Sequence, residues 1–192
     1  MKKIFTLIFA CIAAMTAMAQ SDGSTVSKTW GLAGTGTAAD PYLVSTAADF
    51  KAMAENCNAD HKGTGEYFKM TNDIDFGGTA DSPAQLPAIG KDGNAQITTI
   101  AYGFDGTFDG DGHTISGIYH TENSNNANGK YNGLFGCIDK NGVVKNIVFS
   151  ENNHITGYNY VGSIASLNMG TIENCSNYAD ITATNFAAGG IC

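Results

Sequence analysis

Carboxylates gather in one short stretch of the chain. Asp105, Asp109 and Asp111 lie two to six residues apart, and His113 follows closely. Carboxylate oxygens at such spacing are ligands that Ca²⁺ accepts, and a pair of carboxylates is also the acid and base of glycoside hydrolysis. Aspartate alternating with glycine is at the same time a favourable turn sequence. We therefore interpret the stretch first as a structural turn, second as a calcium site and last as a catalytic pair.

The other reactive side chains form no recognisable motif. Neither Gly-x-Ser-x-Gly nor His-Glu-x-x-His occurs, so the common nucleophile and zinc-peptidase signatures are absent. No metal-ligand spacing relates the four histidines His61, His113, His120 and His154. No Cys-x-x-Cys pair links Cys57, Cys137, Cys175 and Cys192, which we expect to be free and mostly buried thiols. We expect no cofactor other than calcium.

Two further pairs of side chains lie two residues apart, so each pair would share one face of an extended strand. For Asp73 and Asp75 the expectation is a solvated face. Tyr158 and Tyr160 could stack on sugars or on a protein partner, or could pack between neighbouring repeats. The spacing alone leaves these alternatives open.

The first nineteen residues have the layout of a cleaved secretory signal: Lys2-Lys3, an apolar stretch from 4 to 14, and Ala17-Met18-Ala19. Cleavage after residue 19 leaves eight lysines, no arginine and eighteen acids, a net charge of 8 − 18 = −10. Such a chain has little means of neutralising phosphates, which excludes nucleic acid as a partner. We expect a protein exported to the cell surface, the medium or the periplasm, without membrane insertion once the signal is removed.

One helix and several short strands are predicted near the start of the mature chain. Ser45 or Thr46 can cap a helix of about three turns, with Asp49 in its first turn and an apolar stripe of Phe50, Met53, Ala54 and Cys57. Short strands are expected at 42–44, 67–70 and 74–76, loop structure over 77–99, and a polar surface loop over 121–130. The helix would cover an open end of the β region.

A repeat of about 28 residues is the strongest organising signal. Asn141-Gly142-Val143-Val144-Lys145-Asn146-Ile147 matches Met169-Gly170-Thr171-Ile172-Glu173-Asn174-Cys175, and Asp111-Gly112 to Ile118 fits the same frame with one extra residue. Self-similarity at a fixed period predicts a solenoid. Short strands between Gly and Asn turns predict a single-stranded right-handed parallel β-helix over 67–192, preceded by an N-terminal segment (20–66) that carries the capping helix.

In such a coil, like residues of successive turns stack about 4.8 Å apart. The frame predicts three apolar columns: Ile115, Val144 and Ile172; Ile118, Ile147 and Cys175; and Ile138, Ile164 and Ile191. Asn146 and Asn174 would share a corner and form an amide ladder. The frame sets Cys137 and Cys192 two turns apart, beyond disulfide reach. The chain ends in mid-turn at Cys192, so further turns or a cap are expected beyond it.

The residues also resemble a known family. Gly34-Thr35-Gly36-Thr37, Asp40-Pro41-Tyr42-Leu43-Val44, Asn72-Asp73-Ile74-Asp75, Ala88-Ile89-Gly90 and the stretch from Phe104 to Ile115 resemble the N-terminal part of bacterial surface proteins with GLUG repeats. Gly133-Leu134-Phe135-Gly136 and the following Asn-Gly units resemble the repeats themselves. This resemblance spans about residues 30 to 192. It implies a pectate-lyase-like β-helix of the kind found in exported adhesins and in the non-catalytic region of immunoglobulin A metallopeptidases.

Two functions follow from this interpretation. The first is a non-enzymatic scaffold, adhesive or surface-presenting, whose partner is an extracellular protein or a glycan. The alternative is a polysaccharide-active lyase or hydrolase that uses the acidic stretch, with calcium as its cofactor.

Overall fold

The computed structural model describes residues 30–59, 62–90, 103–122, 124 and 131–192. The expected signal (1–19) lies outside these residues, as does most of the polar stretch 121–130. The described chain is β1 (Tyr42–Val44), α1 (Ala47–Asn58), β2 (Tyr67–Met70), β3 (Ile74–Asp75), β4 (Thr107–Asp109), β5 (Thr114–Ser116), β6 (Tyr119–Glu122), β7 (Phe135–Ile138), β8 (Val143–Lys145), β9 (Val148–Phe149), β10 (His154–Gly157), β11 (Ala165–Asn168), β12 (Thr171–Glu173), β13 (Ser176–Asn177) and β14 (Asp180–Ala183). The predicted all-β class with one helix is confirmed, and so are the first three strands, except that Phe76 falls outside β3.

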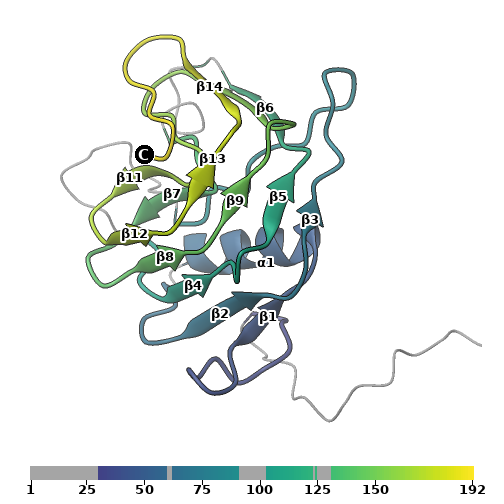
Figure 1. Ribbon diagram of the computed structural model, residues 1–192. Helices are drawn as coiled ribbons and strands as arrows, with labels where there is room; N and C mark the ends of the chain where they lie inside the picture. The colour runs from purple at the N-terminus through teal and green to yellow at the C-terminus, as the bar shows by residue number, and fades with distance from the viewer. Residues whose placement is uncertain (1–29, 60–61, 91–102, 123, 125–130) are drawn as a thin grey trace, which may run out of the picture.

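The strands form four sheets, and their paired neighbours run parallel. The orders are β1-β2-β4-β8-β12, β3-β5-β9-β13, β6-β10-β14 and β7-β11. From β4 onward the chain visits the four sheets in the same sequence and then returns to the first. We call one such passage a circuit. Figure 1 shows β2, β4, β8 and β12 lying one above the next as successive circuits return.

The register confirms one predicted column in part and corrects it in part. Val144 pairs with Ile172, as expected. The residue of the preceding circuit that pairs with Val144 is Phe108 and not Ile115; Ile115 pairs with Ile74 and Phe149 in a different sheet.

The cause of this error is a local insertion. Asp109 pairs with Lys145 and Thr114 with Val148, so the earlier circuit uses two more residues at this corner. Asp111 and Gly112 lie in the insertion with φ of 53° and 81°. The counterpart of Asn141-Gly142 is therefore Asp105-Gly106, and the Asp-Gly pair chosen from the sequence was the wrong one.

The other two columns are also partly corrected. Ile147 and Cys175 precede the paired residues Val148 and Ser176, so they do share a register. Ile118 does not join them; its N–H donates to the Oδ1 of Asn153 (2.9 Å), the residue that precedes β10. In the third column, Ile164 N–H donates to the Ile191 carbonyl at 3.2 Å, whereas Ile138 pairs with Asn168.

Glycine recurs at the start of the five-stranded sheet's strands because successive circuits approach closely there. A Cβ on Gly170 would lie 2.2 Å from the Gly142 carbonyl oxygen, and one on Gly142 would lie 2.4 Å from the Phe104 carbonyl oxygen. Any side chain would force the circuits apart. This contact explains the repeated x-Gly-hydrophobic motif.

The helix forms as its sequence predicts. Thr46 is the N-cap, and it exchanges hydrogen bonds with Asp49 in a capping box. Phe50, Met53, Ala54 and Cys57 are buried. The Phe50 ring lies 5.8 Å from that of Phe76 and 5.4 Å from that of Phe108, so α1 covers the core near the N-terminal edge of the sheets. No helix of the described residues has the length and hydropathy needed to cross a bilayer.

Aromatic rings connect the circuits inside the core. Centroids of Trp30 and Phe68 lie 4.9 Å apart, those of Phe68 and Phe104 5.7 Å, and those of Phe104 and Phe135 5.0 Å. The described cysteines, Cys57, Cys137, Cys175 and Cys192, form no disulfide with one another, as predicted. Two of them, Cys57 and Cys137, are buried, and desolvation raises the pKa of the Cys57 thiol to about 12.

Candidate functional site

Asp105 of the predicted acidic cluster is a buried structural brace. This residue is 7% exposed. The carboxylate accepts hydrogen bonds from Thr64 Oγ1 at 3.0 Å and from Asn141, whose backbone N–H and Nδ2 both lie at 3.1 Å. Burial opposes ionisation, but the hydrogen bonds from Asn141 and Thr64 outweigh it, so the pKa of Asp105 is lowered. Asp105 therefore ties its own circuit to the next one.

Asp109 and Asp111 are engaged at the opposite end of β4. Asp109 accepts from Asn146 Nδ2 at 2.8 Å and from the Asp111 N–H at 2.9 Å, and it forms an ion pair with Lys145 Nζ at 3.5 Å. Asp111 lies 3.0 Å from Lys69 Nζ. Burial opposes ionisation of Asp109, but the hydrogen bonds from Asn146 and Asp111 and the charge of Lys145 outweigh this effect, so the pKa of Asp109 is lowered.

These positions do not support the two chemical interpretations of the cluster. Among the described residues, no group of three or more Asp, Glu, His or Cys is arranged to hold a metal ion, so the three aspartates do not form one calcium site. A general acid in glycoside hydrolysis needs a raised pKa. Asp105 and Asp109 both have lowered pKa values, and hydrogen bonds already occupy their oxygens.

Asp73 and Asp75 are both exposed, as expected of a solvated face, and Asp73 also contacts a neighbouring part of the stack. Asp73 accepts from the Thr114 N–H at 2.8 Å and from His113 Nδ1 at 3.2 Å, and these two contacts lower its pKa. Asn146 and Asn174 share a left-handed corner, with φ of 56° and 51°. The Asn146 side-chain amide, however, donates to Asp109 and not to Asn174, so the predicted amide ladder does not form between these two residues.

The two tyrosines do not share a strand face. Tyr160 lies outside β10 with φ of 39°. Its ring stacks at 6.5 Å on Tyr131 and lies 5.2 Å from Phe186. Of the two alternatives, Tyr160 therefore takes the packing role between circuits.

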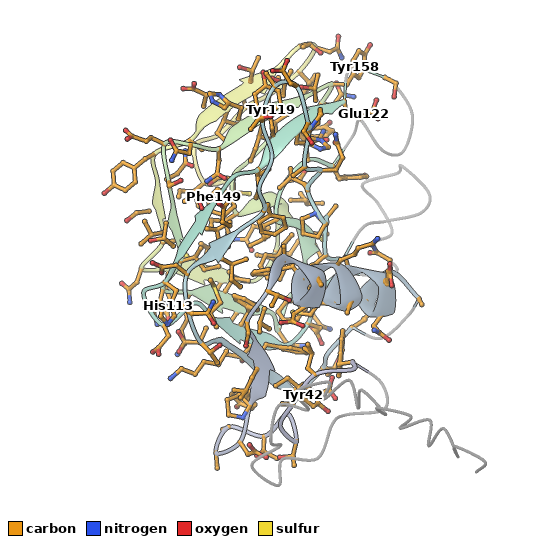
Figure 2. The ribbon with its side chains drawn as sticks, turned by 90° about the vertical axis from the view of Figure 1, so that its right-hand side faces the viewer. Tyr42, His113, Tyr119, Glu122, Phe149 and Tyr158 are labelled. Atoms are coloured by element: carbon orange, nitrogen blue, oxygen red, sulfur yellow. The ribbon has the colours of Figure 1, made fainter. Side chains whose placement is uncertain are left out.

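A surface of a different character covers the three-stranded sheet. The outward side chains of β6, β10 and β14 form two rows: Tyr119, His154 and Asp180 in one, and Thr121, Thr156 and Thr182 in the other. We call these six residues the threonine face. They point outward because the intervening residues His120, Ile155 and Ile181 are directed to the core, where His120 and Ile155 are buried. Figure 2 marks its position by Tyr119.

The threonine face lines a shallow pocket of about 330 Å³. The Tyr119 and His154 rings lie 5.3 Å apart, and His154 Nδ1 lies 3.3 Å from Asp180 Oδ2. The three threonine hydroxyls form no hydrogen bond with any other described residue. Beneath them, His120 Nε2 contacts Asn132 Oδ1 at 2.7 Å, and the Leu86 N–H donates to His120 Nδ1 at 3.4 Å. These contacts fit the neutral tautomer with its proton on Nε2.

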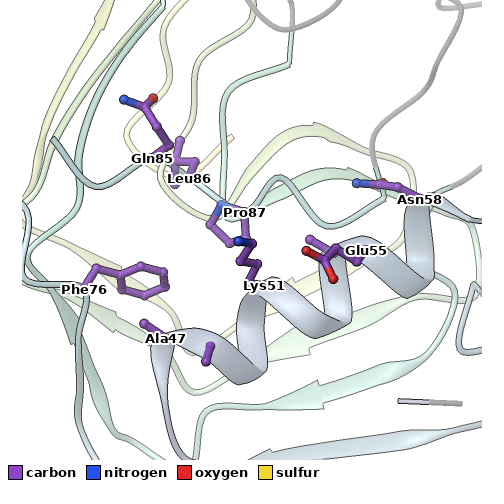
Figure 3. A pocket seen from close by; sticks show the side chains of 10 residues that line it. Ala47, Lys51, Glu55, Asn58, Phe76, Gln85, Leu86 and Pro87 are labelled. Carbon is purple, nitrogen blue, oxygen red and sulfur yellow. The ribbon is translucent and has the colours of Figure 1, made fainter. Parts of the chain in front are cut away.

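A second, larger hollow of about 690 Å³ lies beside α1. Figure 3 shows it between the helix residues Ala47, Lys51 and Glu55 and the side chains of Phe76 and Pro87. Most of its other lining side chains are apolar, and Lys51 and Glu55 of α1 line it on the helix side. This hollow therefore has little net charge.

No signal in the sequence points to the threonine face. Thr121, Thr156 and Thr182 are separated by 35 and 26 residues, so they do not follow a fixed period. Threonine is also an ordinary strand residue. Only the register of the sheet brings these hydroxyls together.

Comparison with known proteins gives two relatives. Halomucin of Haloquadratum walsbyi is 30% identical over 170 residues, which are 88% of this chain and 2% of halomucin. A protein of Evansella cellulosilytica described as a Gly-rich membrane protein is 31% identical over 173 residues, which are 88% of this chain and 18% of that protein. The chain thus spans only a small part of either relative. No family model matches it, and no solved structure does.

Proposed function

We propose that this protein is an exported, non-enzymatic repeat scaffold that presents its outer sheet faces to extracellular partners. We further propose that its circuits form one right-handed parallel β-helix and that it belongs with the GLUG-repeat surface proteins. The observation that carries the proposal is the recurrent parallel pairing of strands about one repeat apart, such as Val144 with Ile172.

The use of polar side chains supports a scaffold. Asp105, Asp109 and Asn153 each bridge different circuits through short hydrogen bonds. A buried polar group contributes to stability when its partners are in place and costs free energy when they are missing. Residues that could have supplied chemistry therefore stabilise the stack of circuits.

The two relatives support an extracellular or envelope role. One is described as a membrane protein, and both are far longer than the region matched here. A stack of circuits can be extended with little change, because each contacts only its neighbours. A repeated module of a large envelope protein fits this property.

Protease treatment of intact cells tests the proposal. The full chain carries an epitope tag after residue 192 and is produced in the organism that encodes it, beside a cytoplasmic marker protein. We expect external protease to remove the tag from intact cells while the cytoplasmic marker stays intact. If the protein is released, we expect to recover the tagged chain from the medium. A tag that stays protected until the cells are lysed would contradict display outside the cell.

A turnover assay tests the non-enzymatic part. Purified protein is incubated with polygalacturonate and with neutral polysaccharides, with and without Ca²⁺, and products are measured as reducing ends and by absorbance of unsaturated sugars. We expect no turnover. If the wild-type protein turns over a polysaccharide and the folded Asp109→Asn variant does not, the scaffold proposal is wrong and the protein is an enzyme.

A further inference from the structure

We infer that the threonine face is a binding site for neutral oligosaccharides, which would lie across β6, β10 and β14. This inference rests on the proposed function, because it names the class of partner that the scaffold would hold. Three features support it: uncommitted hydroxyls in one row, an aromatic ring beside them, and a lining with one carboxylate and no lysine.

The hydroxyls are available because the fold does not use them. Other short polar side chains are occupied: Ser163 Oγ donates to the Gly190 carbonyl and Asn153 Nδ2 to the Ile115 carbonyl. In contrast, the hydroxyls of Thr121, Thr156 and Thr182 have no hydrogen-bond partner in the described part of the chain. They therefore face solvent, where a ligand can replace water.

The arrangement of the face suits a sugar. A hydroxyl both donates and accepts, as the hydroxyls of a sugar do. Adjacent strands set the three threonines about 4.8 Å apart, so the row spans two strand intervals and matches a ligand with hydroxyls along its length. In the second row, Tyr119 offers a ring to the C–H face of a sugar, and the Asp180 carboxylate can accept from two neighbouring hydroxyls.

The charge of the region selects neutral glycans. The protein has a net charge of −8, and the face itself carries Asp180 with His154 as the nearest basic group. An acidic polysaccharide would meet a carboxylate and no lysine among the residues that line this pocket. Repulsion between like charges disfavours it.

Affinity electrophoresis tests the inference. Native gels contain hydroxyethylcellulose, galactomannan or soluble xylan, with polygalacturonate as the acidic comparison. The test variant is Thr121→Val/Thr156→Val/Thr182→Val, which removes the hydroxyls and keeps β-branched side chains. The control is Thr171→Val, the same exchange on the outward side of β12. Thermal melting checks that both variants fold.

We expect at least one neutral polymer to retard the wild-type chain and Thr171→Val equally. The triple variant should bind about tenfold more weakly or worse, because each lost hydrogen bond contributes up to about 1.5 kcal/mol. Should the triple variant not fold, Tyr119→Ala provides the same comparison. The inference would be overturned if no neutral polymer retarded the wild-type chain, or if only polygalacturonate did. It would also be overturned if the triple variant were retarded as strongly as the wild type. If the protein is displayed on cells but binds none of the polymers, the proposed function is unaffected and only the inferred binding site is contradicted.

Discussion

A cysteine pair placed across β4 and β8 tests the register on which the fold depends. Thr107 and Val143 are paired Cα partners, and both side chains are half-buried and point outward from the five-stranded sheet. Adjacent parallel strands hold such partners about 4.8 Å apart. A disulfide needs a Cα separation of about 4.4 to 6.8 Å. Thr107→Cys/Val143→Cys should therefore oxidise without displacing the backbone.

The size of the effect follows from the loop that the bond closes. Residues 107 to 143 enclose about 37 residues, and the chain-entropy relation gives a stabilisation of about 4 kcal/mol for a loop of this length. Strain in the folded state would reduce this value. The oxidised variant should then unfold at a clearly higher denaturant concentration than its reduced form.

The assay uses a background in which Cys175 and Cys192, the two described cysteines that are not fully buried, are replaced by serine. Free thiols are counted under denaturing conditions, and urea unfolding is followed with and without reductant. The control is Thr114→Cys/Val143→Cys, the pair that the sequence-based column of Ile115 with Val144 would bring together. If the control pair cross-links and the Thr107 pair does not, the circuit assignment is wrong.

Three further predictions concern stability. Phe108→Ala should destabilise the fold by about 3–5 kcal/mol, because its ring is fully buried beside Phe50 and Phe135; Phe186→Ala, at a 70% exposed site, should change little in the same urea titration. Thr46→Ala should cost about 1 kcal/mol by removing the N-cap, measured as a lowered midpoint of unfolding. The pKa of Asp105 is lower in the folded than in the unfolded chain, so its contribution is complete above about pH 5 and is lost as pH falls through the folded value. Wild type should therefore lose more stability between pH 5 and pH 2.5 than Asp105→Asn; an equal loss would refute this role.

Local physics made the first part of the fold predictable. The helix has its cap, its first-turn acid and its apolar stripe within thirteen consecutive residues, and each of these signals acts between near neighbours. The strand at Tyr42–Val44 ends just before that cap. The free thiols also followed from the wide spacing of the cysteines.

The stacked columns were harder to predict from the sequence, because their register depends on the number of residues between successive circuits. A regular interval of 28 residues separates Val144 from Ile172, and that pair was predicted. Phe108 and Val144 are 36 residues apart, because the chain between them carries extra residues at a corner and over 121–130. This stretch contains three Asp-Gly pairs, which begin at residues 105, 109 and 111, and only one of them can occupy the corresponding place in the frame. The register identifies Asp105-Gly106 as the counterpart of Asn141-Gly142, because Phe108 pairs with Val144.

The role of the acidic cluster follows from this same geometry. A carboxylate at a corner between circuits meets backbone N–H groups and amides of the next circuit, as Asp105 meets Asn141. These contacts lower its pKa and engage its oxygens in hydrogen bonds within the fold, so it is not the protonated carboxyl that a general acid needs. On β6, β10 and β14, the outward side chains have their equivalents on the adjacent strands as neighbours. Where those equivalents are threonines, as on β6, β10 and β14, their hydroxyls stay uncommitted. In a stack of this kind, polar residues that look reactive in the sequence therefore hold the circuits together, and ordinary strand threonines provide the surface that can bind a ligand.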